Sequence, residues 1–513
     1  MTLKRLLLIG LTLLAMMLSG LSLFASWQKP QFQSRLELYQ TNIVLQAQAW
    51  QPEDSNDENF LAIREAILGD KPLESATKQY QQARESVQTN LDKAKNQLTK
   101  QVPEDIAPVT KISPAEQLQK SQQPIKQLQK LQDELDLRLG ILQAKQGKLD
   151  SAFKTWSQLQ QRSDINLESA ETANILSGLW SNPPRLLPNA QQLIQKNLEG
   201  WFRSTALVQL YQLQQRQDAL SAIQSTQQKT AIAAIWKLAI IATIPSLTAL
   251  IGLILLIVLV IQRILKGRES ILAQNADKPW STPWDVETIL QVFVLGFFLM
   301  GQLFIPELLT LLPIPRSTGN ARIEAFSVLV SYLLVASGAL SVLYFSIRRY
   351  FPLAEEWFRF RFQGNWFLWG LGGYCTALPI VVIVSLINQK LWQGQGGSNP
   401  LLQLALESRD SIALGIFFFT AAIAAPLFEE LLFRGFLLPS LTRYLPVWGS
   451  ILVSSLLFAA AHLSLSEILP LTALGMVLGV VYTRSRNLFA PMLLHSLWNS
   501  GTLLSLFLLG SGN

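Results

Sequence analysis

The second half of the chain is a series of apolar runs, each long enough to cross a bilayer. A crossing takes about 20 apolar residues, and the stretch 238–510 contains eight such runs between short polar loops. A further run, 6–25, follows Lys4 and Arg5 at the N-terminus. Runs of this length predict helices, because a spanning helix satisfies its own backbone hydrogen bonds in lipid. The expected fold is all-α, a polytopic membrane bundle of eight to nine transmembrane helices with an N-terminal extramembrane helical domain. The later runs are 239–262, 287–312, 324–346, 366–387, 411–438, 447–465, 468–483 and 488–509.

The distribution of polar residues divides the chain into four parts. The run at 6–25 is long for the apolar region of a signal peptide, which favours an uncleaved anchor over a cleaved signal. A polar, Gln-rich stretch follows before the apolar runs resume. The predicted parts are an N-terminal transmembrane anchor or signal (1–26), an extracytoplasmic helical domain (27–235), a transmembrane helix with its linker (236–284) and a membrane-embedded domain (285–513).

Basic residues indicate the orientation of the spans. Cytoplasmic loops of membrane proteins are enriched in Lys and Arg, and nine spans with a cytoplasmic N-terminus place most basic clusters on that side. These clusters are Arg263/Lys266/Arg268, Arg348/Arg349, Arg359/Arg361, Arg443 and Arg484/Arg486. The formal net charge of +7 therefore reflects topology, and we expect no nucleic-acid partner. A plasma membrane and a thylakoid membrane remain equally open.

The polar domain at 27–235 is predicted to be helical and to bind a protein partner. Gly140, Gly147, Ala152 and Trp156 have the offsets of a tetratricopeptide repeat, in which small residues allow paired helices to approach. A partial second copy contains Ala76, Tyr80 and Ala83, but it lies 76 residues away, which is not a multiple of the 34-residue repeat. A degenerate helical repeat and a plain antiparallel bundle both remain open.

Ionisable residues inside the apolar runs are the strongest functional signal, because such residues are costly in lipid and usually face a bundle interior or a wet cavity. The run 411–438 contains Glu429, Glu430 and Arg434. Glu430 and Arg434 are four residues apart and can pair on one helix face, whereas Glu429 is rotated by about 100°. We expect Arg434 to hold one carboxylate while the other faces a cavity. Pro426 should kink the helix one turn earlier.

The only two histidines of the chain, His462 and His495, lie in the next apolar runs. His462 is expected on one helix face with Phe458, and His495 on one face with Asn499, because each pair is four residues apart. Either histidine alone is more typical of packing than of catalysis. Polar groups at one-turn spacing on three neighbouring spans favour a single site.

In order, Glu429-Glu430-x-x-x-Arg434, Phe458-x-x-x-His462 and His495-x-x-x-Asn499 resemble the signature motifs of the CPBP family. That family comprises CAAX prenyl endopeptidases, Abi proteins and bacteriocin-processing or immunity proteins. The resemblance covers 285–510 at most and implies an intramembrane endopeptidase acting on membrane-associated proteins. It further implies that Glu429 activates a water, that Glu430 and Arg434 support it, and that Asn499 stabilises the oxyanion.

The resemblance leaves the cofactor open. His462, His495 and Glu429 could hold a divalent metal such as zinc, since two histidines and a carboxylate can form a zinc site with an open position. The same residues could instead activate water without a metal. The alternative function is a non-catalytic membrane scaffold, or a bacteriocin-immunity-like protein, that binds partners through the helical domain. A transporter is less favoured, because the chain shows no inverted repeat.

Overall fold

The structure is a computed structural model, and it describes residues 2–27, 33–50, 65, 67–100, 114–162, 167–311, 320–392, 395–398 and 410–510. The chain forms two compact units. The membrane unit contains Met1–Gln33 and Ile241–Ser511, and the polar unit contains Ser34–Ile240. The long helix α10 (Gln217–Lys266) contributes residues to both units.

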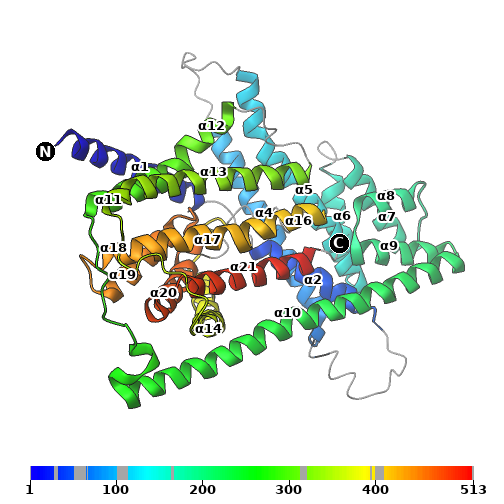
Figure 1. The fold of residues 1–513 in the computed structure, drawn as a ribbon. Helices are drawn as coiled ribbons and strands as arrows, with labels where there is room; N and C mark the ends of the chain where they lie inside the picture. The colour runs from blue at the N-terminus through cyan, green and yellow to red at the C-terminus, as the bar shows by residue number, and fades with distance from the viewer. Residues whose placement is uncertain are drawn as a thin grey trace. The chain divides into compact units, whose positions relative to one another are not determined.

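The predicted all-α fold is confirmed for the described residues, which form helices and no strands (Figure 1). The polar unit contains α2 (Gln33–Ala47), α4 (Pro72–Lys100), α5 (Pro114–Lys145), α6 (Leu149–Gln160), α7 (Leu167–Trp180), α8 (Ala190–Asn197) and α9 (Gly200–Leu213). The membrane unit contains α1 (Leu3–Trp27), η1 (Gly267–Glu269), η2 (Ile271–Ala273), α11 (Val286–Leu290), η3 (Gln291–Phe304), α12 (Ile305–Leu311), α13 (Ala321–Ile347), η4 (Arg348–Tyr350), α14 (Trp366–Trp392), α16 (Ser411–Phe419), η5 (Thr420–Ala424), α17 (Ala425–Glu430), η6 (Leu431–Leu437), α18 (Leu438–Leu441), α19 (Val447–Ala460), η7 (Leu465–Glu467), α20 (Ile468–Ser485) and α21 (Phe489–Gly510).

Eight helices in the described part of the chain are long and apolar enough to cross a membrane, which agrees with the expected eight to nine. The expected span at 447–465 is the exception. Its helix α19 ends at Ala460 after 14 residues, and 14 residues of α-helix extend only about 21 Å against a hydrocarbon core of about 30 Å. His462 therefore lies in the turn that follows α19, not on the helix as the sequence predicted.

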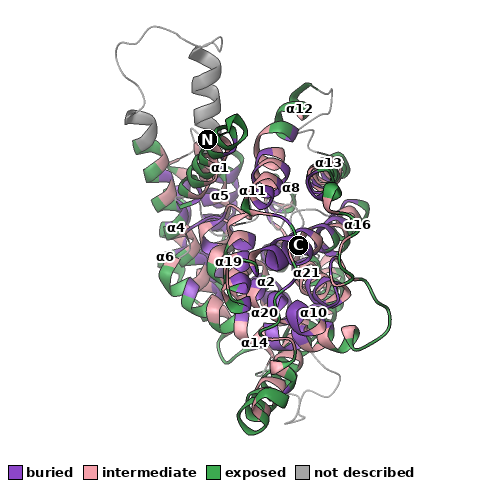
Figure 2. Cartoon of the chain, turned by 60° about the vertical axis from the view of Figure 1, so that its left-hand side comes forward, coloured by how far each residue is buried: buried purple, intermediate pink, exposed green. Residues whose placement is uncertain are grey.

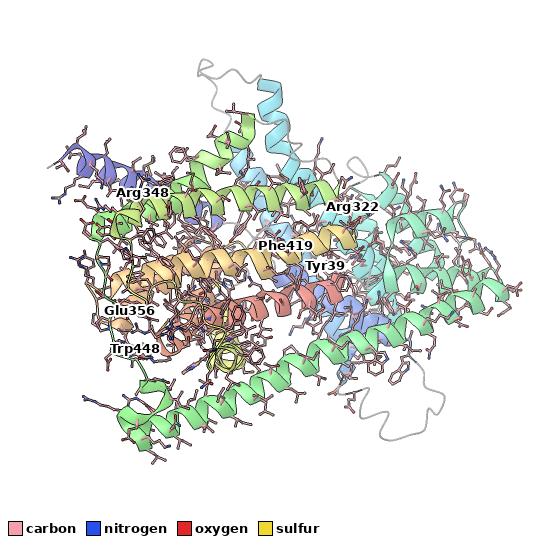
Figure 3. All side chains as sticks on the ribbon, viewed as in Figure 1. Tyr39, Arg322, Arg348, Glu356, Phe419 and Trp448 are labelled. Carbon is pink, nitrogen blue, oxygen red and sulfur yellow. The ribbon has the colours of Figure 1, made fainter. Side chains whose placement is uncertain are left out.

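Most basic residues of the membrane unit lie at one end of its helices. Arg443 donates to the backbone oxygen of Trp284 at 2.6 Å, and the Nε of Arg484 donates to that of Leu272 at 2.8 Å. Arg5 pairs with Glu287, which lies at the start of α11. Arg348, Glu356 and Trp448 lie at this end in Figure 3, whereas Arg322 lies at the other. The basic groups thus share one face, and its assignment to the cytoplasm stays a prediction.

Helices in the centre of the membrane unit carry the motif residues. The helices α19, α20 and α21 have buried residues along their length, whereas α12 is mostly exposed (Figure 2). Aromatic side chains fill the space around η6. Phe433 contacts Phe293, Phe297 and Phe458, each at 5.4 Å between ring centroids. This packing fixes the backbone on which Glu429, Glu430 and Arg434 lie.

The polar unit has its own core, in which α5 and α6 approach closely. The indole of Trp156 is fully buried and lies where a side chain on Gly140 would be, since a Cβ there would come within 2.1 Å of the indole nitrogen. Gly147 has a φ of +77° in the turn between these helices, a conformation that glycine adopts easily. These contacts explain the predicted small-residue pattern, and they suit a repeat hairpin and a plain bundle equally.

A buried carboxylate makes the stability of the polar unit depend on pH. Burial raises the pKa of Asp133 from 3.8 to about 6, and Arg162 at 3.5 Å offsets this only in part. The folded state therefore binds this proton more tightly than the unfolded state. The contribution of Asp133 to the free energy of unfolding is therefore largest below about pH 4 and falls as the pH rises to about 6.

Replacing Asp133 by asparagine is expected to remove this pH dependence. At pH 7.5, Asp133→Asn should raise the free energy of unfolding of the polar unit by about 1–3 kcal/mol, and at pH 4 by much less. Hydrogen exchange of α5 and α6 amides in the full-length protein, corrected for intrinsic rates, measures both values. The exposed Asp150 supplies the control Asp150→Asn. An equal change at both pH values would contradict the prediction.

Candidate active site

A fully buried ion pair lies at the centre of the site. Glu430 and Arg434 have no exposed side-chain surface, and the Nη1 of Arg434 donates to the Oε1 of Glu430 at 2.9 Å. Arg434 also donates to the backbone oxygen of Gly475 at 3.1 Å, and its guanidinium lies over the ring of Phe458 at 4.6 Å. This pairing matches the geometry expected from the four-residue spacing.

The ion pair orients His495, which lies on α21. The Nδ1 of His495 is 2.8 Å from the Oε1 of Glu430, the oxygen that also accepts from Arg434. An ionised carboxylate only accepts hydrogen bonds, so we assign the proton of the neutral imidazole to Nδ1. The Nε2 of His495 then presents a lone pair, and it lies 4.0 Å from the Oε2 of Glu429.

Glu429 occupies the more open side of the cluster. Its side chain is 16% exposed, whereas that of Glu430 is fully buried. Its Oε1 accepts a hydrogen bond of 3.2 Å from the hydroxyl of Tyr332 on α13. The two adjacent glutamates therefore have different surroundings, as the 100° rotation predicted. Glu430 is held by a cation and a histidine, and Glu429 has an oxygen facing His495.

His462 reaches the cluster through an aromatic ring. Its Nδ1 lies 2.9 Å from the backbone oxygen of Phe458, a contact in which the nitrogen must donate. The Phe458 ring lies 5.0 Å from the His462 ring and 5.7 Å from the His495 ring. We therefore assign the Nδ1 tautomer to both neutral imidazoles, and in this tautomer each Nε2 is an acceptor.

Asn499 supports the backbone at Pro426. The backbone N–H of Ala425 donates to the oxygen of Thr420, five residues earlier. Pro426 has no N–H to make the next bond of this kind, which would be to the oxygen of Ala421. The Nδ2 of Asn499 donates to that oxygen at 2.7 Å. Asn499 thus replaces the bond that Pro426 omits, as membrane interiors require for a freed carbonyl, and one N–H of its amide remains for another acceptor.

This substitution for a backbone bond predicts coupling between Asn499 and Pro426. In the reaction that we propose below, Asn499→Ala alone should lower kcat by about 10- to 100-fold. Pro426→Ala restores an N–H that can take the place of the asparagine. The double variant should therefore recover about 5- to 10-fold of the loss, and a double-mutant cycle on the purified protein measures this coupling. Strictly additive losses would contradict it.

The residues expected to hold zinc have suitable donor atoms, and the zinc site stays a prediction. Zinc sites use imidazole nitrogens and carboxylate oxygens, which His462, His495 and Glu429 could supply. However, the described residues include no group of three His, Cys, Asp or Glu side chains placed to hold a metal ion. We therefore derive no step through a metal.

The structure brings most of the expected site residues together. Glu429, Glu430, Arg434 and His495 form one cluster, and His462 adjoins it through Phe458. Asn499 follows His495 by four residues on α21 and donates to the backbone oxygen of Ala421. Sequence reasoning missed Tyr332, because a single tyrosine in an apolar run has no motif partner. It also missed a bond at the far end of α1, where the Ser26 hydroxyl accepts from the N–H of Leu465, in the loop that carries His462.

The fold and the cluster together define a polytopic membrane protein with a buried acid–base site. Residues 411–501 match the family model described as type II CAAX prenyl endopeptidase Rce1-like. The match spans α16 to most of α21 and contains all three motifs. It confirms the predicted resemblance for this segment, and the relation of 285–410 to the family stays a prediction.

Three curated proteins are similar to parts of the chain. "Putative membrane peptidase YdiL" of Bacillus subtilis is 26% identical over 133 residues, which are 26% of this chain and 53% of that protein. "Membrane-embedded CAAX protease MroQ" of Staphylococcus aureus is 28% identical over 137 residues, or 26% of this chain and 54% of that protein. An "Uncharacterized 24.3 kDa protein" of Escherichia coli is 43% identical over 81 residues, which are 15% of this chain and 37% of that protein.

The chain spans about half the length of the first two relatives and less of the third. No solved structure matches it. Together with the eight candidate spans, these similarities establish an integral, multi-pass membrane protein.

Proposed function

We propose that this protein is an intramembrane endopeptidase that hydrolyses peptide bonds of membrane-associated polypeptides. The observation that carries the proposal is the separation of 4.0 Å between the Oε2 of Glu429 and the Nε2 of His495. Both atoms are acceptors, and both side chains are held from the opposite side, Glu429 by Tyr332 and His495 by Glu430.

A water fits between these two acceptors. Hydrogen bonds of about 2.8 Å to both atoms, across a 4.0 Å gap, give an angle of about 90° at the water oxygen. Such a water donates both hydrogens, one to Glu429 and one to His495, and its oxygen lone pairs face away from them. That arrangement suits nucleophilic attack on a carbonyl carbon.

In the proposed reaction, Glu429 carries one proton from the attacking water to the leaving nitrogen. Glu429 takes a proton from the water while the water oxygen forms a bond to the peptide carbonyl carbon. The carbonyl oxygen then becomes an oxyanion. The remaining amide N–H of Asn499 donates to this oxyanion. Glu429 then gives its proton to the leaving nitrogen as the C–N bond breaks. His462 supports the site through its Nε2, which accepts from a substrate N–H.

The partners of the reaction are also proposals. The substrates are polypeptides that reach the cluster from the bilayer. The polar unit has no catalytic role in this proposal and binds a protein partner. The prenylated targets in the names of the similar proteins belong to those proteins. We propose no lipid group on the substrate here.

The decisive experiment separates catalysis from scaffolding. A deletion strain is complemented with wild type or with a variant combining Glu429→Ala, His462→Ala and His495→Ala, and membrane-protein fragments are compared by proteomics. We expect fragments only with wild type, and equal membrane insertion of both proteins. Full complementation by the triple variant would support the non-catalytic scaffold and overturn the proposal.

Metal content is tested on the same protein. The proposed reaction needs no metal. Activity should therefore persist after treatment with a chelator, in protein that metal analysis shows to be metal-free. Loss on chelation and recovery with Zn²⁺ would replace the metal-free reaction with the zinc site that the donor types suggest.

A further inference from the structure

We propose that Tyr332 is a positioning residue for Glu429, a role that rests on the proposed function. Tyr332 lies on α13, outside the matched segment 411–501 and outside the three sequence motifs. Its hydroxyl donates to the Oε1 of Glu429 at 3.2 Å. The catalytic cluster therefore includes a helix that the matched segment does not contain.

The hydrogen bond gives the two oxygens of Glu429 different roles. Oε1 accepts from Tyr332, whereas Oε2 faces the Nε2 of His495 at 4.0 Å. A carboxylate on a partly exposed side chain can rotate between several orientations. Holding one oxygen on α13 leaves the other oxygen aimed at the water between Glu429 and His495.

Arg434 does not perform this task for Glu429. Its hydrogen bonds go to Glu430 and to the backbone oxygen of Gly475. The hydroxyl of Tyr332 is the donor that the structure places on Glu429. A neutral donor suits a general base, because it orients the carboxylate with less loss of basicity than a cation would cause.

The same bond persists after proton transfer. When Glu429 carries the water's proton on Oε2, its Oε1 is a carbonyl oxygen and still accepts from Tyr332. The acid therefore keeps the orientation needed to return that proton to the leaving nitrogen. Tyr332 acts at both proton transfers without exchanging a proton itself.

The ring of Tyr332 has a separate packing role, which allows a clean test. It contacts the Phe428 ring at 6.0 Å and an interplanar angle of 85°. Tyr332→Phe keeps the ring and this contact, and it removes only the hydroxyl. Tyr482→Phe is the matched control, because it also removes only a hydroxyl, and Tyr482 stacks on Trp280 at the basic end of the bundle.

The test measures kcat, KM and thermal unfolding of the full-length protein in detergent. Tyr332→Phe should lower kcat by about 10- to 100-fold, as loss of a hydrogen bond to a charged group predicts. KM should change by less than about 3-fold, because the hydroxyl contacts the base and not the substrate. The unfolding midpoint should stay near that of wild type, and Tyr482→Phe should leave kcat unchanged.

Glu429→Gln, measured alongside, separates the two proposals. If Glu429→Gln is inactive and Tyr332→Phe has the kcat of wild type, only the role of Tyr332 is overturned. A fall in kcat of Tyr332→Phe that merely follows a loss of folded protein also overturns it. If Glu429→Gln retains activity, the proposed function itself is wrong.

Discussion

Glu429→Gln is expected to lower kcat by at least about 10³-fold while the protein remains folded and inserted. A positioned general base contributes about 10²- to 10⁴-fold, and in the proposed reaction Glu429 both accepts and returns the proton. The amide of glutamine keeps an oxygen that can accept from Tyr332, so the surrounding contacts change little. Steady-state cleavage by purified protein, with substrate identified from the proteomic comparison, measures the effect.

The controls for this prediction lie in the same unit. Glu307 on α12 is exposed, and Glu307→Gln removes one carboxylate from the membrane unit without reaching the cluster. This variant should keep the activity of wild type. Activity of Glu429→Gln within about tenfold of wild type would show that another group activates the water.

Arg434→Met is expected to have the largest effect on stability. Arg434 and Glu430 are both fully buried, and removing one member of such a pair typically costs about 3–5 kcal/mol, because it leaves an uncompensated charge. The variant also loses the bond to Gly475 and the contact with Phe458. Thermal unfolding in detergent and the amount of protein in the membrane should both fall.

A second substitution distinguishes charge from packing. Adding Glu430→Gln to Arg434→Met removes the unpaired charge, and most of the lost stability should return. Activity should stay low, because a neutral amide is a weaker acceptor than a carboxylate for the Nδ1 proton of His495. If the double variant is no more stable than Arg434→Met, packing and not the charge explains the loss.

Short-range parts of the site could be predicted from the sequence. The four-residue spacing of Glu430 and Arg434 placed them on one helix face, and the structure shows that ion pair. Long apolar runs likewise predicted helices, because length and hydropathy are local properties of a span. The predicted end of the span at 447–465 was wrong by five residues, because α19 ends at Ala460. Helix ends depend on the turn that follows, and they are the least reliable part of a sequence-based prediction. His462 therefore lies in the turn after α19 and not on a helix, as the sequence had predicted.

Contacts between distant helices could not be predicted. The bond from Tyr332 to Glu429 joins residues 97 positions apart, and that from Asn499 to Ala421 joins residues 78 apart. No local periodicity encodes such distances, because they depend on how whole helices pack.

The sequence by itself determined that this is a helical membrane protein and that the ionisable residues of the three motifs lie in apolar runs, where the cost of polar groups in lipid indicates a function. Only the tertiary structure decided how those residues divide their roles. Burial assigns Glu430 to Arg434 and His495, and it leaves Glu429 on the more open side with one oxygen on Tyr332. That difference arises because two adjacent residues on one helix face different neighbours, and the neighbours come from helices far away in the chain.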